Sequence, residues 1–131
     1  MPNLLSLFQY DGDQIPLEIC LLRRVSCLPG VVRLMDYYDC GDAFNLILAR
    51  PGWGNGGNNR GSKDLFDYIT ERGRLEEAVA RAIVAQVVTT VLQAHQQGVI
   101  HRDIKDENIL VSIKKPFILV RNIKKKLESN F

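Results

Sequence analysis

Apolar residues recur at helical spacing in the second half of the chain. One row, with its members four residues apart, consists of Leu75, Val79, Ile83, Val87 and Val91. A second row beside it consists of Val84, Val88 and Leu92. This spacing predicts a helix over residues 75–97 that ends at Gly98. Because so wide an apolar face needs a partner, we expect this helix to be the most buried element of the fold.

The first half of the chain reads as a helix followed by a hairpin. Residues 1–13 carry no clear pattern. A helix is predicted to begin at Pro16, a residue favoured at the first helical position, and to bury one apolar side. The apolar runs 31–38 and 43–49 then predict two antiparallel strands joined by the turn-rich segment 39–42.

Three further segments complete the coarse pattern. Glycine and asparagine dominate residues 52–61, which predicts a surface loop. Asp64 to Arg72 predicts a short helix closed by Gly73. Beyond residue 113 the pattern allows a hairpin arm, followed by a tail with the basic run Lys124-Lys125-Lys126. A basic run binds nucleic acid or anionic lipid in some proteins, but a solvated tail is the simpler interpretation.

Composition places the chain among globular proteins of one domain. It has 131 residues, 46% of them hydrophobic and 24% charged, with a net charge of +2. The three cysteines have no C-x-x-C spacing, which favours reduced thiols in the cytoplasm or nucleus over a disulfide framework or a zinc site. No uninterrupted apolar run predicts a membrane span, and the N-terminus lacks a basic region that leads into an apolar one.

An octapeptide carries the strongest chemical signal. His101 to Asn108 fills every fixed position of H-R-D-x-x-x-x-N, the catalytic loop of protein kinases. In that chemistry an aspartate accepts the proton of the attacking hydroxyl, and an asparagine holds magnesium on the nucleotide phosphates. The motif assigns these roles to Asp103 and Asn108. Lys105, two residues after the base, would reach the transferring phosphate, as in serine/threonine kinases.

The resemblance to one kinase family extends well beyond this loop. Five segments resemble the Pim family of serine/threonine kinases: Ile15–Glu18, Leu21–Val25, Pro29–Leu34, Asp64–Gly73 and His101–Leu110. They occur in the family's order over about residues 14–113, with one insertion near residues 52–61. The resemblance implies an α+β fold that is an incomplete protein-kinase fold, and a chain that forms a single partial kinase domain.

The same resemblance assigns a place to each segment. Residues 14–49 would be part of the small lobe, with the αC helix and an antiparallel hairpin. Residues 50–63 would be the hinge between the lobes with its insertion. Residues 64–113 would be part of the mainly helical large lobe, and residues 114–131 a divergent basic tail.

The resemblance also implies binding residues for ATP, Mg²⁺ and a protein substrate. Glu18 matches the αC glutamate of the nucleotide site, and Ala49 and Pro51 would face the adenine at the hinge. The acidic residues Asp64, Asp67 and Glu107 match positions that face substrates rich in arginine or lysine. For Asp64 and Asp67 an alternative stays open, because acidic residues are also common at helix starts.

Four parts of kinase chemistry have no counterpart in this sequence. No glycine-rich loop precedes the first helix, and no lysine occurs before Lys63 to pair with Glu18. No aspartate occurs after Asp106, so the metal-binding D-F-G aspartate is missing, and the segment that holds the substrate is absent as well. We therefore expect this chain to be inactive by itself.

Two functions remain open, and a third is weaker. The first is an ATP-dependent serine/threonine protein kinase whose activity belongs to a longer form. The second is a non-catalytic interaction module or degenerate fragment, whose uncovered apolar faces would bind a partner or a chaperone. The third, nucleic-acid binding, depends only on the basic tail. No interleaving of aromatic and basic residues supports specific recognition of nucleic acid.

Overall fold

The computed structural model describes residues 7–10, 12–49, 61–112, 118–120 and 125–126. Its helical elements are α1 (Leu17–Val25), α2 (Leu65–Arg72), α3 (Glu77–Gln96) and the 3₁₀ turn η2 (Asp106–Asn108). Its strands are β1 (Leu7–Tyr10), β2 (Asp13–Pro16), β3 (Leu34–Asp39), β4 (Phe44–Leu48), β5 (Ser62–Asp64), β6 (Val99–Ile100), β7 (Ile109–Ser112), β8 (Ile118–Val120) and β9 (Lys125–Lys126). Helices combine with small antiparallel sheets, as expected for part of a kinase fold.

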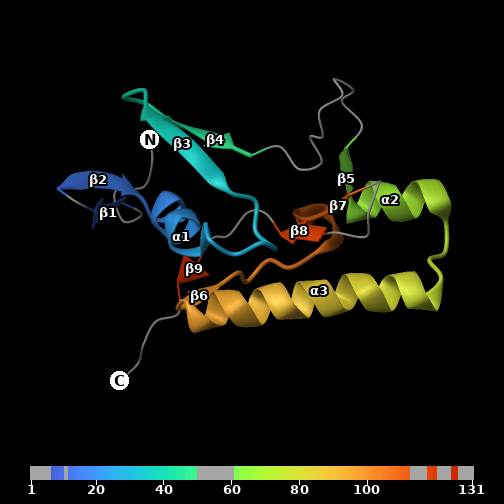
Figure 1. Ribbon diagram of the computed structural model, residues 1–131. Helices are drawn as coiled ribbons and strands as arrows, with labels where there is room; N and C mark the ends of the chain where they lie inside the picture. The colour runs from blue at the N-terminus through green and yellow to red at the C-terminus, as the bar shows by residue number, and fades with distance from the viewer. Residues whose placement is uncertain (1–6, 11, 50–60, 113–117, 121–124, 127–131) are drawn as a thin grey trace.

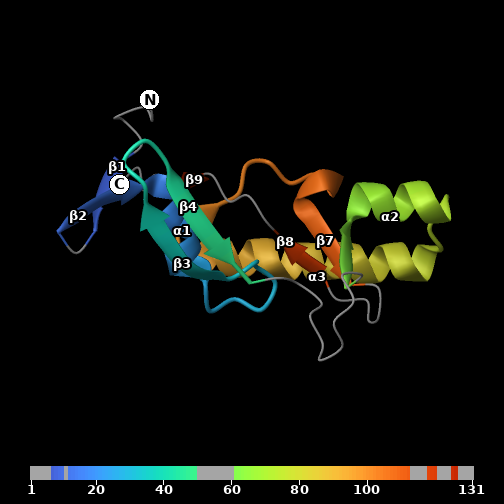
Figure 2. The ribbon, with the colours of Figure 1, turned by 90° about the horizontal axis from the view of Figure 1, so that it is seen from above.

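Helix α3 runs along one side of the molecule from beneath α2 to β6, and the β1–β2 hairpin lies beyond its C-terminal end (Figure 1). Helix α2 and the three-stranded sheet β5-β7-β8 lie over its N-terminal part. Helix α1 lies near its C-terminal end, and the β3–β4 hairpin covers α1 on the side away from α3 (Figures 1 and 2). The predicted small-lobe and large-lobe parts therefore both contact one long helix.

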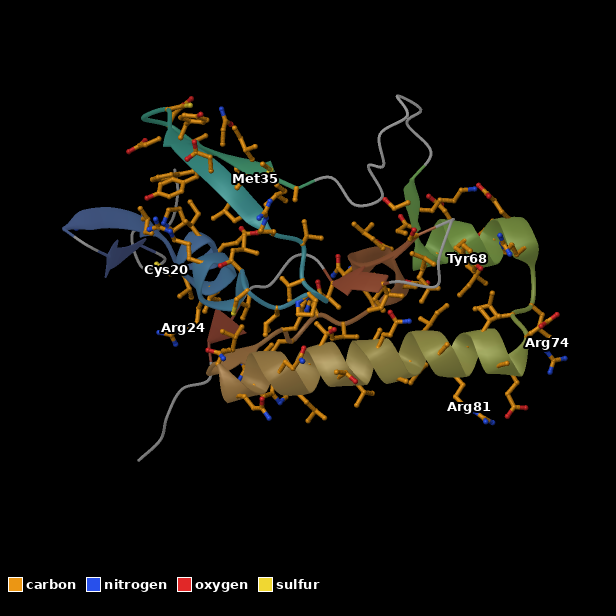
Figure 3. The ribbon with its side chains drawn as sticks, viewed as in Figure 1. Cys20, Arg24, Met35, Tyr68, Arg74 and Arg81 are labelled. Atoms are coloured by element: carbon orange, nitrogen blue, oxygen red, sulfur yellow. The ribbon has the colours of Figure 1, made fainter. Side chains whose placement is uncertain are left out.

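Two apolar clusters form the core. One joins α1 to the C-terminal end of α3 through Leu21, Leu22, Val25, Val31, Ala94 and Val99. The other joins the middle of α3 to strands β7 and β8 through Ile83, Ile109, Val111, Ile118 and Val120. Tyr68 points from α2 toward α3 (Figure 3) and packs against this second cluster.

Residues 30–32 connect the two clusters through backbone pairing with β8. The N–H of Val120 donates to the C=O of Gly30 at 2.7 Å, and the N–H of Val32 donates to the C=O of Val120 at 3.1 Å. Val31 forms an isolated parallel bridge to Val120. The loop after α1 is thereby fixed to β8, the strand that pairs with β7.

Most of the predicted elements form where the pattern places them. The β3–β4 hairpin and helices α2 and α3 begin and end within a few residues of the predicted bounds. Two details differ at the start of the chain. Helix α1 begins at Leu17, because Pro16 ends strand β2 and precedes the helix with an extended backbone. Strands β1 and β2 form a hairpin that the sequence did not predict, since residues 1–13 carried no clear pattern and Pro16 was expected to begin a helix.

The expectation that α3 is the most buried element is wrong. Only Ile83, Thr90 and Ala94 of its twenty residues are buried, whereas α1 buries four of nine. The second apolar row is exposed: Val84 by 59%, Val88 by 50% and Leu92 by 56%. Among the described residues, β7 and β8 cover only the row that contains Ile83. The sequence pattern shows how wide the apolar face is, but not what covers it.

By length and composition, α3 also qualifies as a candidate membrane span, with a mean hydropathy of 1.2 over its best window. The sequence did not predict a membrane span here, because α3 contains no long uninterrupted apolar run. Its charged first turns carry Glu77 and Arg81, which form an ion pair, and Arg81 points away from the body of the molecule (Figure 3). Its buried residues pack against both clusters, as those of a core helix do.

The three cysteines are free thiols, as the sequence predicts. Cys27 and Cys40 are exposed, and Cys20 is partly buried on α1. Burial raises the pKa of the Cys20 thiol, while the nearby guanidinium of Arg23 opposes that effect. No group of three or more metal-ligating side chains occurs in the described part of the chain.

Candidate catalytic loop

The motif residues 101–108 form a loop between strands β6 and β7, as predicted. Arg102 adopts a φ of 63°, a left-handed conformation that is uncommon for a residue with a side chain. The chain bends at Arg102, directly after His101. The 3₁₀ turn η2 then closes the loop, with the N–H of Asn108 donating to the C=O of Lys105 at 2.9 Å.

The side chains of Asp103 and Asn108 meet inside this loop. Asn108 is buried, and its Nδ2 donates to the backbone C=O of Asp103 at 2.8 Å and to Oδ2 of Asp103 at 3.2 Å. Five residues apart in sequence, the predicted base and the predicted metal ligand are therefore in direct contact. The amide fixes the orientation of the Asp103 carboxylate, which remains partly exposed.

Lys105 lies between two carboxylates at the rim of the loop. Its Nζ is 3.9 Å from Oδ2 of Asp103 and 4.0 Å from Oε2 of Glu107. All three side chains are at least partly exposed, so each pair contributes little to stability. The arrangement does bring a cationic group next to the carboxylate that would accept a proton.

His101 positions the loop and is a residue that the sequence assignment of roles missed. It is 5% exposed, and its Nδ1 accepts a hydrogen bond from the N–H of Asp103 at 3.0 Å. Its ring lines a small apolar pocket together with Val31, Ala94 and Val99. His101 occupies the first fixed position of the motif, which could have indicated a role, but the sequence analysis assigned it none.

The acidic residues predicted to face substrate lie close to this loop. Asp64 pairs with Leu110 in the β5–β7 ladder, and helix α2 contacts η2. Asp67, in the first turn of α2, is exposed, and so is Glu107. The fold therefore brings both ends of the predicted acidic set to one region of the surface.

Asp64 also has a structural task. Its Oδ1 accepts a hydrogen bond from the N–H of Asp67 at 2.8 Å, which caps helix α2. The helix-start interpretation, left open by the sequence, therefore holds for Asp64. Its position beside the catalytic loop leaves the substrate role as a proposal.

We expect Asp64→Ala to lower the free energy of unfolding by about 0.5–2 kcal/mol, because it removes the cap of α2. Asp64→Asn should retain most of the stability, since an amide oxygen also caps. Asp67→Ala is the matched control, because it removes a first-turn charge without removing the cap acceptor. Urea unfolding of the three variants measures the difference; equal losses for Asp64→Ala and Asp67→Ala would contradict a capping role.

The residues predicted to bind the nucleotide are not brought together by the described structure. Glu18 is exposed in the first turn of α1, which packs against β1, β2, β3 and β9. Ala49 follows β4, and its N–H donates to the C=O of Arg33 at 2.8 Å. Pro51 lies outside the described residues, and so does most of the predicted hinge, residues 50–63. Their nucleotide roles remain predictions.

Comparison with known proteins shows the family of this chain. A model of the protein kinase domain matches residues 6–123. The chain belongs to the protein kinase family. It is 37% identical over 103 residues to the serine/threonine-protein kinase prk-2 of Caenorhabditis elegans, a match that covers 79% of this chain and 22% of the relative. It is also 37% identical over 109 residues to the serine/threonine-protein kinase pim-2 of Danio rerio, covering 77% and 33% respectively.

A solved kinase structure has the same fold over most of this kinase chain. The kinase PK-1 of the Cydia pomonella granulovirus superposes with a TM-score of 0.62 at 26% identity, covering 80% of this chain and 36% of that one. The chain thus spans between about a fifth and just over a third of the length of these relatives. Partial kinase architecture, predicted from the sequence, is confirmed.

Proposed function

We propose that this chain carries the catalytic-loop portion of a Pim-like, ATP-dependent serine/threonine protein kinase. In a longer form it would transfer the γ-phosphate of ATP to serine or threonine in basic protein substrates. The contact of Asn108 with the Asp103 carboxylate, with Lys105 nearby, is the observation that carries this proposal. The similarity of the chain to serine/threonine-protein kinases adds support.

Each loop residue has a task that its surroundings suit. The partly exposed Asp103 carboxylate would accept the proton of the substrate hydroxyl. This role requires that a bound substrate can come within hydrogen-bond distance of the carboxylate. The Lys105 ammonium would offset negative charge on the transferring phosphate. Asn108 keeps the carboxylate oriented through its amide N–H, and its amide oxygen is the atom type that binds magnesium.

The described residues do not fit a complete Mg²⁺–ATP site. They contain no group of three or more His, Cys, Asp or Glu side chains that could hold a metal ion. The sequence supplies no lysine before Lys63 and no aspartate after Asp106. Phosphoryl transfer depends on electrostatic groups of these kinds, and removing one typically costs about 10²-fold or more in rate. We therefore propose that the 131-residue chain alone is inactive.

The activity test uses the purified 131-residue chain, radiolabelled ATP and an arginine-rich peptide. We expect no transfer above the background set by Asp103→Asn, which keeps the shape of the side chain but removes the base. Transfer by the original chain that Asp103→Asn abolishes would contradict the proposed inactivity. Fusion of the missing small-lobe and large-lobe segments of a relative, followed by transfer that depends on Asp103, would support the catalytic assignment.

Substrate preference is proposed from the acidic surface formed by Asp67, Glu107 and Asp64. Because opposite charges attract most strongly at low salt, an arginine-rich peptide should bind this surface in a salt-dependent manner. We expect Glu107→Gln and Asp67→Asn together to weaken binding by about threefold to tenfold at low salt. Asp39→Asn, which lies in the distant β3–β4 hairpin, is the control. Equal weakening by Asp39→Asn would show that net charge alone is responsible.

The alternative function is a non-catalytic interaction module. One specific observation favours it for this chain: Val84, Val88 and Leu92 form an exposed apolar row on α3. Such a row favours binding to a protein partner or a chaperone. Activity restored by adding the missing kinase segments would favour the catalytic proposal, whereas stable binding without restored activity would favour the alternative.

A further inference from the structure

Ser26 lies at the C-terminal end of α1, directly after two arginines. Arg23 and Arg24 precede it by three and two residues, with Val25 in between. No other serine or threonine of the sequence has an arginine at both of these positions. This pair of arginines distinguishes Ser26 from the other hydroxyl groups of the chain.

The structure places the hydroxyl and both guanidinium groups at the surface. Arg23 and Arg24 are exposed, and Ser26 is partly exposed at the C-cap of α1. Arg24 projects outward from the helix (Figure 3). Val25 is the residue of this turn that faces the core, and it is buried. A protein that binds this turn from outside would therefore meet the two arginines and the hydroxyl together.

The hydroxyl group is held only by the backbone of its own helix turn in the described structure. Oγ of Ser26 donates to the C=O of Arg23 at 2.8 Å. The N–H of Ser26 donates to the same oxygen at 3.4 Å. The hydroxyl can therefore turn away without leaving that carbonyl unpaired. The position also lies at a helix end, where local opening costs least.

We propose that Ser26 is a phosphorylation site for a serine/threonine kinase that selects arginine two and three residues before its acceptor. Acidic side chains beside the substrate groove of such a kinase would attract the two guanidinium groups. In the reaction, the bond between the γ-phosphorus of ATP and its bridging oxygen breaks, and ADP leaves. A new bond joins this phosphorus to Oγ of Ser26, and the hydroxyl proton passes to the base of the acting kinase. The proposal does not depend on catalysis by this chain.

The phosphate would act on the junction between α1 and the loop that follows it. A phosphorylated Oγ has no proton, so its hydrogen bond to the C=O of Arg23 is lost. The added negative charge also lies beside the negative end of the helix dipole. The guanidinium of Arg23 lies over the Tyr37 ring at 5.6 Å, so it offsets this repulsion only by leaving the ring. We expect the last turn of α1 to open more readily when Ser26 is phosphorylated.

Phosphorylation of the purified 131-residue chain tests the site. The reaction contains radiolabelled ATP and an active serine/threonine kinase with the stated arginine preference. A parallel reaction without added kinase measures any transfer by the chain itself. Mass spectrometry should locate phosphate on Ser26, and Ser26→Ala should remove it. Absence of phosphate on Ser26 overturns the proposal, whether or not a peptide of residues 20–30 is modified.

Paired substitutions test whether the arginines direct the reaction. Arg23→Gln with Arg24→Gln should slow incorporation at Ser26 by about tenfold or more. Arg74→Gln with Arg81→Gln is the matched control, because it removes the same charge from exposed positions at the far end of α3 (Figure 3). The first pair of substitutions placed in the peptide separates recognition from any change in folding. Equal slowing by the two pairs, or an unchanged rate for the substituted peptide, overturns the proposal.

Amide exchange of the phosphorylated chain tests the effect on α1. The N–H of Leu28 donates to the C=O of Val25 at 3.0 Å across the end of the helix. We expect exchange at this amide to become about threefold faster or more, while exchange within α3 stays constant. Unchanged exchange at Leu28 in a chain phosphorylated on Ser26 overturns the proposed opening of α1.

Discussion

Ile83→Ala is expected to lower the free energy of unfolding by about 2–5 kcal/mol. Ile83 is only 3% exposed and packs from the middle of α3 into the cluster formed with β7 and β8. Truncation removes buried methyl groups and leaves a cavity between a helix and two paired strands. Backbone pairing on both sides limits how far these elements can move to fill it. Chemical denaturation followed by circular dichroism measures the loss.

Val84→Ala provides the internal control for this prediction. Val84 is the next residue on α3 but is 59% exposed, so its truncation should change stability by less than about 0.5 kcal/mol. Equal losses would mean that α3 buries a different face. Hydrogen exchange gives a second check: residues 79–92 should exchange slowly. Protection confined to the 31–49 hairpin would show that the α2–α3 half does not fold in this chain.

Gly30→Ala is expected to destabilise the protein by about 3 kcal/mol, at the upper end of the usual cost of overpacking. A Cβ atom built on Gly30 would lie 1.9 Å from Oγ1 and 2.9 Å from Cβ of Thr90. Thr90 is buried on α3, and its hydroxyl donates to the C=O of Gln86. Relief would require α3 to move away from residues 30–32, which would also strain the backbone pairing to Val120.

A double-mutant cycle identifies the contact responsible. Thr90→Gly removes the atoms that the new methyl group would meet, although it also weakens the helix by about 1 kcal/mol. Gly30→Ala should therefore cost much less in the Thr90→Gly background than in the original chain. Additive losses in this cycle would show that the cost of Gly30→Ala does not come from Thr90.

The catalytic loop shows how a local motif predicts local geometry. Asp103, Lys105 and Asn108 lie within six consecutive residues, so a tight loop suffices to bring them together. The hydrogen bond between Asn108 and Asp103 and the proximity of Lys105 show that the three side chains meet, while their catalytic roles remain predictions. The task of His101 was harder to foresee, because it depends on an apolar pocket lined by Val31, Ala94 and Val99 from three separate segments.

The remaining site predictions depend on how segments far apart in the sequence are arranged, and the sequence alone could not decide them. Asp64 was assigned to substrate or to a helix start, and only the structure shows that its carboxylate caps α2 while its backbone pairs beside the loop. The predicted hinge and the basic tail fall largely outside the described residues. Glu18 lies on a helix whose start was predicted nearly correctly, and the sequence offers no upstream lysine that could be its partner in a nucleotide site.

By itself, the sequence determined the protein kinase family, the catalytic loop, and most of the helices and the β3–β4 hairpin, because motifs, turn residues and apolar spacing act over a few neighbouring positions. The tertiary structure alone decided which apolar row of α3 is buried and how closely Gly30 approaches Thr90. The physical reason is the same in each case. A periodic pattern identifies a face or a strand, but whether it is covered depends on segments that lie far away in the chain.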